Sequence, residues 1–376
     1  MNTLPLEVIQ NMFALACTDG GRTGCSLSLT PKTIRAVARS TRFHSVFLDA
    51  FYSNRLYSFM STYEAHCRPL HGSRPRVKHL YLTLGIHGIP SDFPSSGIAA
   101  PIESPDPAPW PLADDVGALL RAVSADILSL VIQVFPNGYA GAAPTPDVPT
   151  LGCTFPSLRE LTVFGTSDPR SFFSGVSAPA MFPSLRRLHI VDANTIYRQF
   201  RDQNLDPWTM HAPEMTHLRI SNLSLRESPG LGGIPVQLAA QMGIPVDDED
   251  EGKSVEESWP RPDDCPPKMH SHLRHIVIQP CIRPSGRLGA ATSYRSGELL
   301  RKLAQYPSYV DLKFVVLAPP KQPGIPAWWT KSMKAQWLER IEGGVGCWVD
   351  AEEDSAEDEG WERPNEFLSV GTEIRT

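Results

Sequence analysis

Two segments of the chain repeat nearly the same sequence. Residues 155–165 read FPSLRELTVFG, and residues 182–192, which begin 27 positions later, read FPSLRRLHIVD. Counted from the leucine after Phe-Pro-Ser, both segments have apolar residues at offsets 0, 3 and 5. Because side chains alternate between the two faces of a strand, offsets 3 and 5 share one face. Each segment is therefore predicted to form a short strand with one buried face, preceded by a turn at the proline.

The same frame of apolar residues recurs along most of the chain. Its copies are Val77-Leu80-Leu82, Ile127-Leu130-Ile132, Leu158-Leu161-Val163, Leu185-Leu188-Ile190, Met215-Leu218-Ile220, Leu273-Ile276-Ile278 and, more weakly, Tyr309-Leu312-Phe314. Successive copies begin 50, 31, 27, 30, 58 and 36 residues apart. The shorter intervals are close to the period of leucine-rich repeats, which is about 20–29 residues. One such strand cannot bury its face alone, so the copies are expected to stack in a parallel sheet with right-handed crossovers.

The residues before the repeats predict a short helical unit. Pro5 suits the first position of a helix, where the backbone N–H has no partner. Asp19-Gly20-Gly21 is expected to end this helix, and a second short helix is expected after Thr30-Pro31. A strand is expected within residues 42–48 and a further helix over residues 52–66. The apolar stripe of the first helix consists of Val8, Ile9, Met12, Phe13 and Ala16.

The net charge of −6 is unevenly distributed. Residues 247–257 contain seven acids and one lysine, and residues 350–362 contain eight acids. Without these two blocks, whose charges are −6 and −8, the remaining chain carries about +8. Two interpretations stay open. The blocks are solvated and disordered, or they fold over a basic face and screen it.

These patterns divide the chain into three parts. Residues 1–50 form the helical unit, residues 51–345 the repeat region, and residues 346–376 an acidic C-terminal tail. Two inserts that are rich in Pro, Gly or acidic residues are expected within the repeat region, at about 88–112 and 227–267. The predicted fold class is α/β, with an irregular leucine-rich-repeat-like solenoid on a parallel sheet behind the helical unit.

The composition indicates a protein of the cytoplasm, the nucleus or both. Seven cysteines without regular spacing argue against a disulfide framework and favour a reducing compartment. The N-terminus has no basic region before its first apolar stretch, so no secretory signal is expected. No run of about 18 apolar residues is present, so no membrane partner is expected.

The N-terminal segment resembles the divergent F-box-like segment that opens many proteins of mushroom-forming fungi. The resemblance is carried by LPLEVIQNMFALACTDGG (4–21) and CSLSLTPKTIRAVARSTRFHSVFL (25–48). Residues 4–13 match the family's Leu-Pro-x-Glu start and its hydrophobic helix. The repeat region looks like the leucine-rich tails that often accompany such boxes. Many F-boxes have a Cys-Lys/Arg-x-Trp-like ending in the later helix, whereas this chain has Lys32-Thr33-Ile34-Arg35 and no tryptophan there.

In the F-box family the helical unit docks on the Skp adaptor of cullin–RING ubiquitin ligases, and the C-terminal part holds the substrate. The resemblance therefore implies a non-catalytic substrate-recognition subunit of an SCF-type ubiquitin ligase. Its partners would be a Skp-family adaptor, a cullin reached through that adaptor, and an unknown protein target. The alternative is an interaction scaffold of the same fold that lacks adaptor binding. The residues assigned to the adaptor surface are Leu4, Pro5, Val8, Ile9, Met12 and Phe13.

Strand residues between the apolar positions are expected to form an open second face of the sheet. They are interpreted either as ordinary exposed residues or as a partly cationic surface for a partner with acidic or phosphorylated groups. Histidines on this face are expected to titrate near pH 6–7. A helix at 327–341 is expected to cap the last repeat and shield the sheet edge. The predicted partner-binding residues are His79, Tyr81, Glu160, Arg187, His189, His217, Arg219 and His275.

The sequence contains no common catalytic or cofactor motif. GxSxG, Walker and HExxH motifs are absent, and no GxGxxG follows a strand. The group nearest to a metal site is His270, His272 and His275 with Cys265 and Cys281, whose spacing matches no common zinc motif. The modest positive charge and the lack of a nucleic-acid-binding motif argue against RNA or DNA. We therefore expect no enzyme activity, no cofactor, no metal and no nucleic-acid partner.

Overall fold

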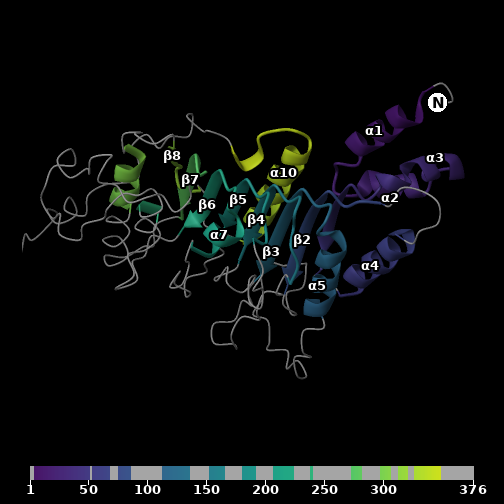
Figure 1. Cartoon of the computed structure of the whole chain (residues 1–376), viewed down its shortest axis with the longest axis horizontal. Helices are drawn as coiled ribbons and strands as arrows, with labels where there is room; N and C mark the ends of the chain where they lie inside the picture. The colour runs from purple at the N-terminus through teal and green to yellow at the C-terminus, as the bar shows by residue number, and fades with distance from the viewer. Residues whose placement is uncertain are drawn as a thin grey trace, which may run out of the picture.

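The protein is built on one parallel sheet with helices packed against it, so the predicted α/β class is confirmed (Figure 1). Its computed structural model describes residues 4–50, 53–67, 75–85, 112–135, 152–165, 180–191, 206–223, 238–239, 272–281, 297–305, 312–320 and 326–348. The inserts expected at about 88–112 and 227–267 lie almost entirely outside these residues. Leu238 and Ala239, within the second insert, are buried in the main core.

The eight strands of the sheet follow one another in chain order, and every neighbouring pair is parallel. The first strand lies within the part of the chain assigned to the helical unit, so the sheet begins before residue 50. The strands are β1 (Ser45–Asp49), β2 (His79–Gly85), β3 (Ser129–Phe135), β4 (Glu160–Phe164), β5 (Arg187–Val191), β6 (His217–Leu223), β7 (His275–Pro280) and β8 (Lys313–Val316).

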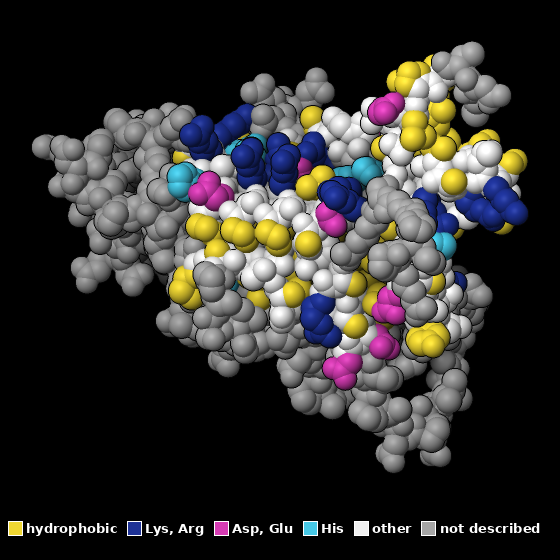
Figure 2. Space-filling view, turned by 45° about the vertical axis from the view of Figure 1, so that its right-hand side comes forward, with side chains coloured by type: hydrophobic (Ala, Val, Ile, Leu, Met, Phe, Trp, Pro, Cys, Tyr) yellow, Lys and Arg dark blue, Asp and Glu magenta, His cyan; other side chains and the backbone are white. Residues whose placement is uncertain are grey.

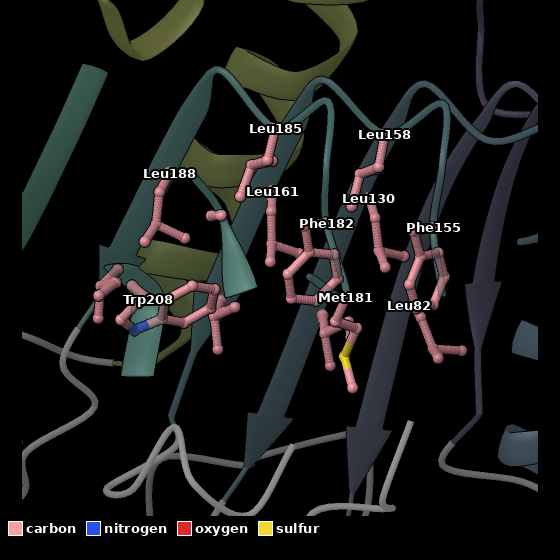
Figure 3. Close-up of a cluster of buried hydrophobic side chains, with 14 of the residues drawn as sticks. Leu82, Leu130, Phe155, Leu158, Leu161, Met181, Phe182, Leu185, Leu188 and Trp208 are labelled. Carbon is pink, nitrogen blue, oxygen red and sulfur yellow. The ribbon is translucent and has the colours of Figure 1, made fainter. Parts of the chain in front are cut away.

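Equivalent positions of the repeat frame face one another across the sheet. Their side chains are buried and form a continuous ladder in the main core, part of which Figure 3 shows. This pairing confirms the predicted frame for six copies. The residues paired at offset 3 are Leu80, Leu130, Leu161, Leu188, Leu218 and Ile276.

The seventh copy of the frame is shifted by two residues from its predicted position. Ile276 pairs with Phe314, so Phe314 occupies offset 3 and not offset 5. Because a shift of two keeps a strand residue on the same face, Phe314 still packs against the main core. Tyr309, the expected first residue of this copy, lies outside the described residues.

The Phe-Pro-Ser turns before β4 and β5 contribute aromatic side chains to the core. Phe155 and Phe182 are fully buried, and their rings stack with centroids 5.5 Å apart. Phe182 in turn stacks on Trp208 at 6.1 Å (Figure 3). In each turn the backbone N–H three residues after the phenylalanine donates to its carbonyl, from Leu158 and from Leu185. The repeated turn therefore places one ring per copy in the layer beneath the strands.

Helices supply the remaining layers. Side chains of α4 and α5 pack into the main core on one face, as expected for residues 52–66, and α7 contributes Trp208 there. The helix α2 was not expected from the sequence. Among the described helices, none combines the length and the apolar character needed to cross a bilayer. The helices are α1 (Leu6–Ala16), α2 (Arg22–Ser28), α3 (Lys32–Val37), η1 (Ala38–Ser40), α4 (Ser53–Cys67), α5 (Leu112–Val123), α7 (Asp206–His211), α10 (Pro326–Ile341) and η4 (Gly346–Trp348).

The C-terminal helix α10 lies on the opposite face of the sheet and not over the last repeat. Its Trp329, Met333 and Trp337 pack in a second core with residues of β2 to β5, such as Tyr81 and Val191. The expectation that this helix caps the sheet edge at β8 is therefore wrong. The short helix η4, within the part assigned to the acidic tail, packs on the same face through Cys347.

Replacing Leu188 by alanine empties a fully buried position in the middle of the ladder. We predict that the free energy of unfolding falls by about 2–5 kcal/mol, because the lost transfer energy and the cavity add. Leu29→Ala makes the same change at a residue that is 89% exposed and should cost less than about 0.5 kcal/mol. Urea unfolding followed by circular dichroism measures both variants. Equal losses of unfolding free energy in the two variants would contradict the burial of Leu188 in the ladder.

Candidate functional site

The N-terminal helices are joined to the edge of the sheet by hydrogen bonds. The hydroxyl of Ser45, at the start of β1, donates to the carbonyl of Cys17 at 2.6 Å and accepts from the N–H of Gly20 at 3.0 Å. The N–H of Phe47 donates to the carbonyl of Gly20 at 3.1 Å. Gly20 has φ +75°, a conformation that glycine adopts without strain. The turn after α1 therefore holds the helical unit against β1.

Asp19, expected to end the first helix, also organises the start of α2. One carboxylate oxygen accepts from the N–H of Gly21 at 3.2 Å, and the other accepts from the N–H and the hydroxyl of Thr23 at 2.8 and 2.7 Å. Inside α2, a Cβ at Gly24 would lie 1.9 Å from the carbonyl oxygen of Arg42. Glycine at this position therefore lets α2 pack directly on the backbone that leads into β1.

The helix α1 exposes an apolar stripe. Met12 is 51% exposed and Leu15 is 76% exposed, and Val8, at i−4 from Met12, is exposed as well. Leu4, which is also exposed, lies just before the helix. Figure 1 shows α1 projecting away from the sheet, and Figure 2 shows hydrophobic side chains on the surface of these projecting helices. Sequence reasoning missed Leu15, although it continues the Val8–Met12 spacing at i+7. Because large exposed apolar patches are uncommon on monomeric proteins, we regard this row as a candidate interaction surface.

The six residues assigned to the adaptor surface divide into two groups. Leu4, Val8 and Met12 are exposed, as is Pro5, which precedes the helix. Ile9 and Phe13 are half-buried. The structure thus leaves one set of these side chains at the surface and partly covers the other, while α1 itself packs on α3 and η1.

The second face of the sheet is covered, so the expectation of an open face is wrong. Tyr81, His189, Arg219 and His275 are buried, and α10 and η4 cover much of the face. Trp337 packs edge-on against Tyr81, with ring centroids 5.5 Å apart. The second face of this sheet also carries apolar side chains, such as Val131 and Phe164, and α10 removes them from water.

His79, Glu160, Arg187 and His217 are the predicted partner-binding residues that stay half-exposed. All four stand at the first position of their strands, where the sheet face meets its edge. Among the predicted partner-binding residues, the accessible ones therefore lie at the border where the strands begin.

Glu160 joins the sheet to α10. Its carboxylate accepts hydrogen bonds from Arg187 at 2.6 Å, on the neighbouring strand, and from Arg340 on α10. Burial raises the pKa of Glu160, but the hydrogen bonds and charges of Arg340 and Arg187 outweigh it, so the pKa lies below its ordinary value. Glu160 is therefore an internal connector in this structure.

Arg219 performs a similar role for η4. Its buried guanidinium donates to the carbonyl of Cys347, to the hydroxyl of Ser221 at 3.0 Å and to the amide oxygen of Gln279 at 3.3 Å. The same Ser221 hydroxyl lies 2.9 Å from Nε2 of His189. These contacts satisfy the polar groups that the sheet would otherwise bury without partners.

His79 and His189 do not titrate near neutral pH, which corrects the expected range of pH 6–7 for these two residues. Burial, with smaller contributions from nearby groups, lowers the pKa of His79 to about 3. Burial and the charge of Arg219 lower the pKa of His189 well below its ordinary value. Both imidazoles are therefore neutral in the folded protein at pH 7.

The space between α10 and the sheet is too small for a ligand. A cavity of about 30 Å³ is lined by residues that include Glu160, His189, Met333 and Trp348. Drug-sized ligand sites measure about 300–1,000 Å³.

The histidines and cysteines considered for zinc do not form a metal site in the part of the chain that the structure describes. Among those residues no group of three or more His, Cys, Asp or Glu is placed to hold a metal ion. Cys265 and His270 lie outside the described residues. His275 is the first residue of β7 and is buried in the sheet.

Comparison with known proteins identifies no relative. The sequence matches no protein-family model, and neither a curated protein nor a solved structure shows significant similarity to it.

Glu160→Gln removes the charge that binds two arginines. We predict a loss of about 1.5–3 kcal/mol in the free energy of unfolding at pH 7, because both guanidinium groups lose a charged partner. The wild-type contribution is present above pH 4.5 and disappears as the pH falls through the lowered pKa of Glu160. Glu298→Gln, which removes the carboxylate paired with Arg301 at a more exposed position, should cost at most about 1 kcal/mol. Urea unfolding measures both, and equal losses would show that Glu160 does not hold α10.

His79→Gln tests the neutral state of this half-buried imidazole. Because the folded pKa of about 3 lies below the unfolded value of 6.5, stability is full above pH 6.5 and falls as the pH is lowered. When the pH is lowered from 7 to 5, this histidine should reduce the free energy of unfolding of the wild type by about 2 kcal/mol. The variant should not show this reduction. The urea midpoints of both proteins at pH 7 and pH 5 measure this difference. A pH dependence of stability in His79→Gln equal to that of the wild type would contradict the neutral state assigned to His79.

Proposed function

We propose that this protein is a non-catalytic substrate-recognition subunit of an SCF-type ubiquitin ligase. In this proposal the N-terminal helices are an F-box-like unit that docks on a Skp-family adaptor, which connects to a cullin. The sheet region, regarded as an irregular leucine-rich-repeat-like solenoid, then binds a protein target. Such a complex acts in the cytoplasm, the nucleus or both.

The observation that carries the proposal is the exposed apolar stripe of α1. The stripe contains Val8 and Met12, which the F-box resemblance assigns to the adaptor surface, and Leu4, which it also assigns there, is exposed just before the helix. The structure describes no residue of this chain that buries them. Exposed apolar area of this kind is stabilised when a partner removes it from water, at about 25 cal/mol per Å².

The way in which the helices attach to the sheet also supports a receptor. The contacts of Ser45 with Cys17 and Gly20 fix the helical unit at the β1 edge of the sheet. A fixed attachment holds a bound target in a defined position relative to the adaptor. The sheet supports the same function, because strands stacked in chain order create an extended edge for binding.

The second candidate is an interaction scaffold that has lost adaptor binding. It is favoured by the later helix of the unit, α3, which has only six residues and begins directly after Pro31. The family ending with a tryptophan is replaced there by Lys32-Thr33-Ile34-Arg35. Both candidates share the fold and the target-binding sheet, and they differ in whether α1 binds an adaptor.

The test is a titration of the full-length chain with a purified Skp-family adaptor. We expect binding, and we expect the double variant Val8→Asp, Met12→Asp to weaken it at least about tenfold, which corresponds to about 1.4 kcal/mol. Both side chains are exposed, so the fold should survive, as circular dichroism would verify.

The matched control is Tyr57→Asp on α4, at a residue that is 72% exposed. It should leave adaptor affinity unchanged. No binding by the wild-type chain would favour the scaffold. Binding that the α1 variant leaves intact would place the adaptor elsewhere and remove the observation on which the proposal rests.

A further inference from the structure

A row of basic side chains lies along the edge of the sheet where the strands begin (Figure 2). Arg159, Arg186 and Arg274 stand directly before β4, β5 and β7, and all three are exposed. We call these three residues the basic row. Thr216 occupies the equivalent position before β6.

Backbone hydrogen bonds join the members of the basic row. The N–H of Arg186 donates to the carbonyl of Arg159 at 2.9 Å, Thr216 donates to Arg186 at 3.0 Å, and Arg274 donates to Thr216 at 2.9 Å. With neighbouring strands about 4.8 Å apart, the row extends over about 14 Å. Its geometry is fixed by the sheet and does not depend on a loop.

The basic row has no acidic counterpart in the described structure. Asp126 lies 3.6 Å from Arg76 and 3.7 Å from Lys78, so the basic residues before β2 have a carboxylate beside them. In the described part of the chain, no carboxylate forms an ion pair with Arg159, Arg186 or Arg274. Like charges on neighbouring strands repel, so an anionic chain across the row would be stabilising.

The described chain ends close to this row. The ring of Trp348 in η4 lies 5.8 Å from the ring of His217. Nδ1 of His217 lies 2.8 Å from the hydroxyl of Thr216, a residue in line with the row. The chain that follows Trp348 therefore starts beside the middle of the basic row.

The residues that follow are acidic. Residues 350–359 read DAEEDSAEDE and contain seven acids and no Lys or Arg. A segment of ten residues can extend over about 33 Å, more than twice the length of the row. A short tether also raises the local concentration of the acids to the millimolar range, which no dilute partner matches.

We propose that the basic row is a binding site for an acidic peptide segment and that residues 350–359 of the same chain occupy it. Carboxylates of this segment pair with the guanidinium groups, and an external acidic ligand binds the row only by displacing the segment. The inference does not rest on the proposed function, because it involves neither α1 nor an adaptor. Its test contains no adaptor, so the two can fail separately.

The test uses full-length protein and a fluorescein-labelled peptide with the sequence of residues 350–362, followed by fluorescence anisotropy. In the tail-neutralised variant the seven acids become amides: Asp350→Asn, Glu352→Gln, Glu353→Gln, Asp354→Asn, Glu357→Gln, Asp358→Asn and Glu359→Gln. We expect this variant to bind the peptide at least about tenfold more tightly than the wild type, because the tethered competitor is removed. Raising the salt concentration should weaken the binding.

The row itself is tested by adding Arg159→Glu, Arg186→Glu and Arg274→Glu to the tail-neutralised variant. This change should abolish the gain in affinity. The matched control reverses three exposed basic residues of α2 and α3 in the same background, Arg22→Glu, Lys32→Glu and Arg35→Glu, and should retain most of the gain. Replacing the three arginines of the basic row by glutamine removes their charge without reversing it and so provides a milder variant. Circular dichroism verifies the fold of each variant.

Three outcomes would overturn the inference. Equal peptide affinity in the wild type and the tail-neutralised variant would show that the segment does not occupy the row. Row-dependent binding that the tail leaves unchanged would assign the row to an acidic partner on another molecule. An equal loss of peptide affinity in the row variant and in the control would show that the binding depends on net charge alone and not on the basic row.

Discussion

The parallel sheet of this protein carries apolar side chains on both faces, and the need to cover both of them governs the structure. The ladder that contains Leu161 and Leu188 is buried by helices and turns on one side. On the other side Tyr81, Phe164 and Val191 form an apolar patch that water would otherwise reach. The helix α10 supplies the missing layer, with Trp329 and Trp337 packed into that patch. Burial of both faces stabilises strands that are individually too short to be stable.

Because α10 and η4 cover the second face, its polar residues interact within the chain. Glu160 and Arg219, which could bind a partner on an open sheet, instead hold α10 and η4 in place. Burying a charge is tolerable only when it is paired or fully hydrogen-bonded, and these residues satisfy that condition within the chain. In the described part of the chain, the apolar stripe of α1 and the edge where the strands begin remain at the surface. For these two surfaces we propose an apolar groove and an anionic chain as the respective partners.

Much of the fold could be predicted from the sequence because its signals are local. Strand periodicity placed six copies of the frame in the correct register, and the Phe-Pro-Ser turn marked where β4 and β5 begin. The candidate site was predicted less well. The spacing of Val8 and Met12 identified the stripe of α1, but Leu15 was missed and Ile9 and Phe13 are half-buried. The partner surface was misjudged, since alternation along a strand shows that a residue leaves one core but not that it enters a second.

The sequence by itself determined which residues form strands and which of their faces pack in the main core, because both depend on alternation over a few neighbouring positions. Only the tertiary structure decided that α10, far from β3 in the sequence, lies across the second face and not at the β8 edge. That choice depends on the sum of many contacts between distant segments, such as Trp337 with Tyr81 and Arg340 with Glu160. No local pattern contains this information, because an apolar helix can cover an edge or a face equally well until the other surfaces of the fold are formed.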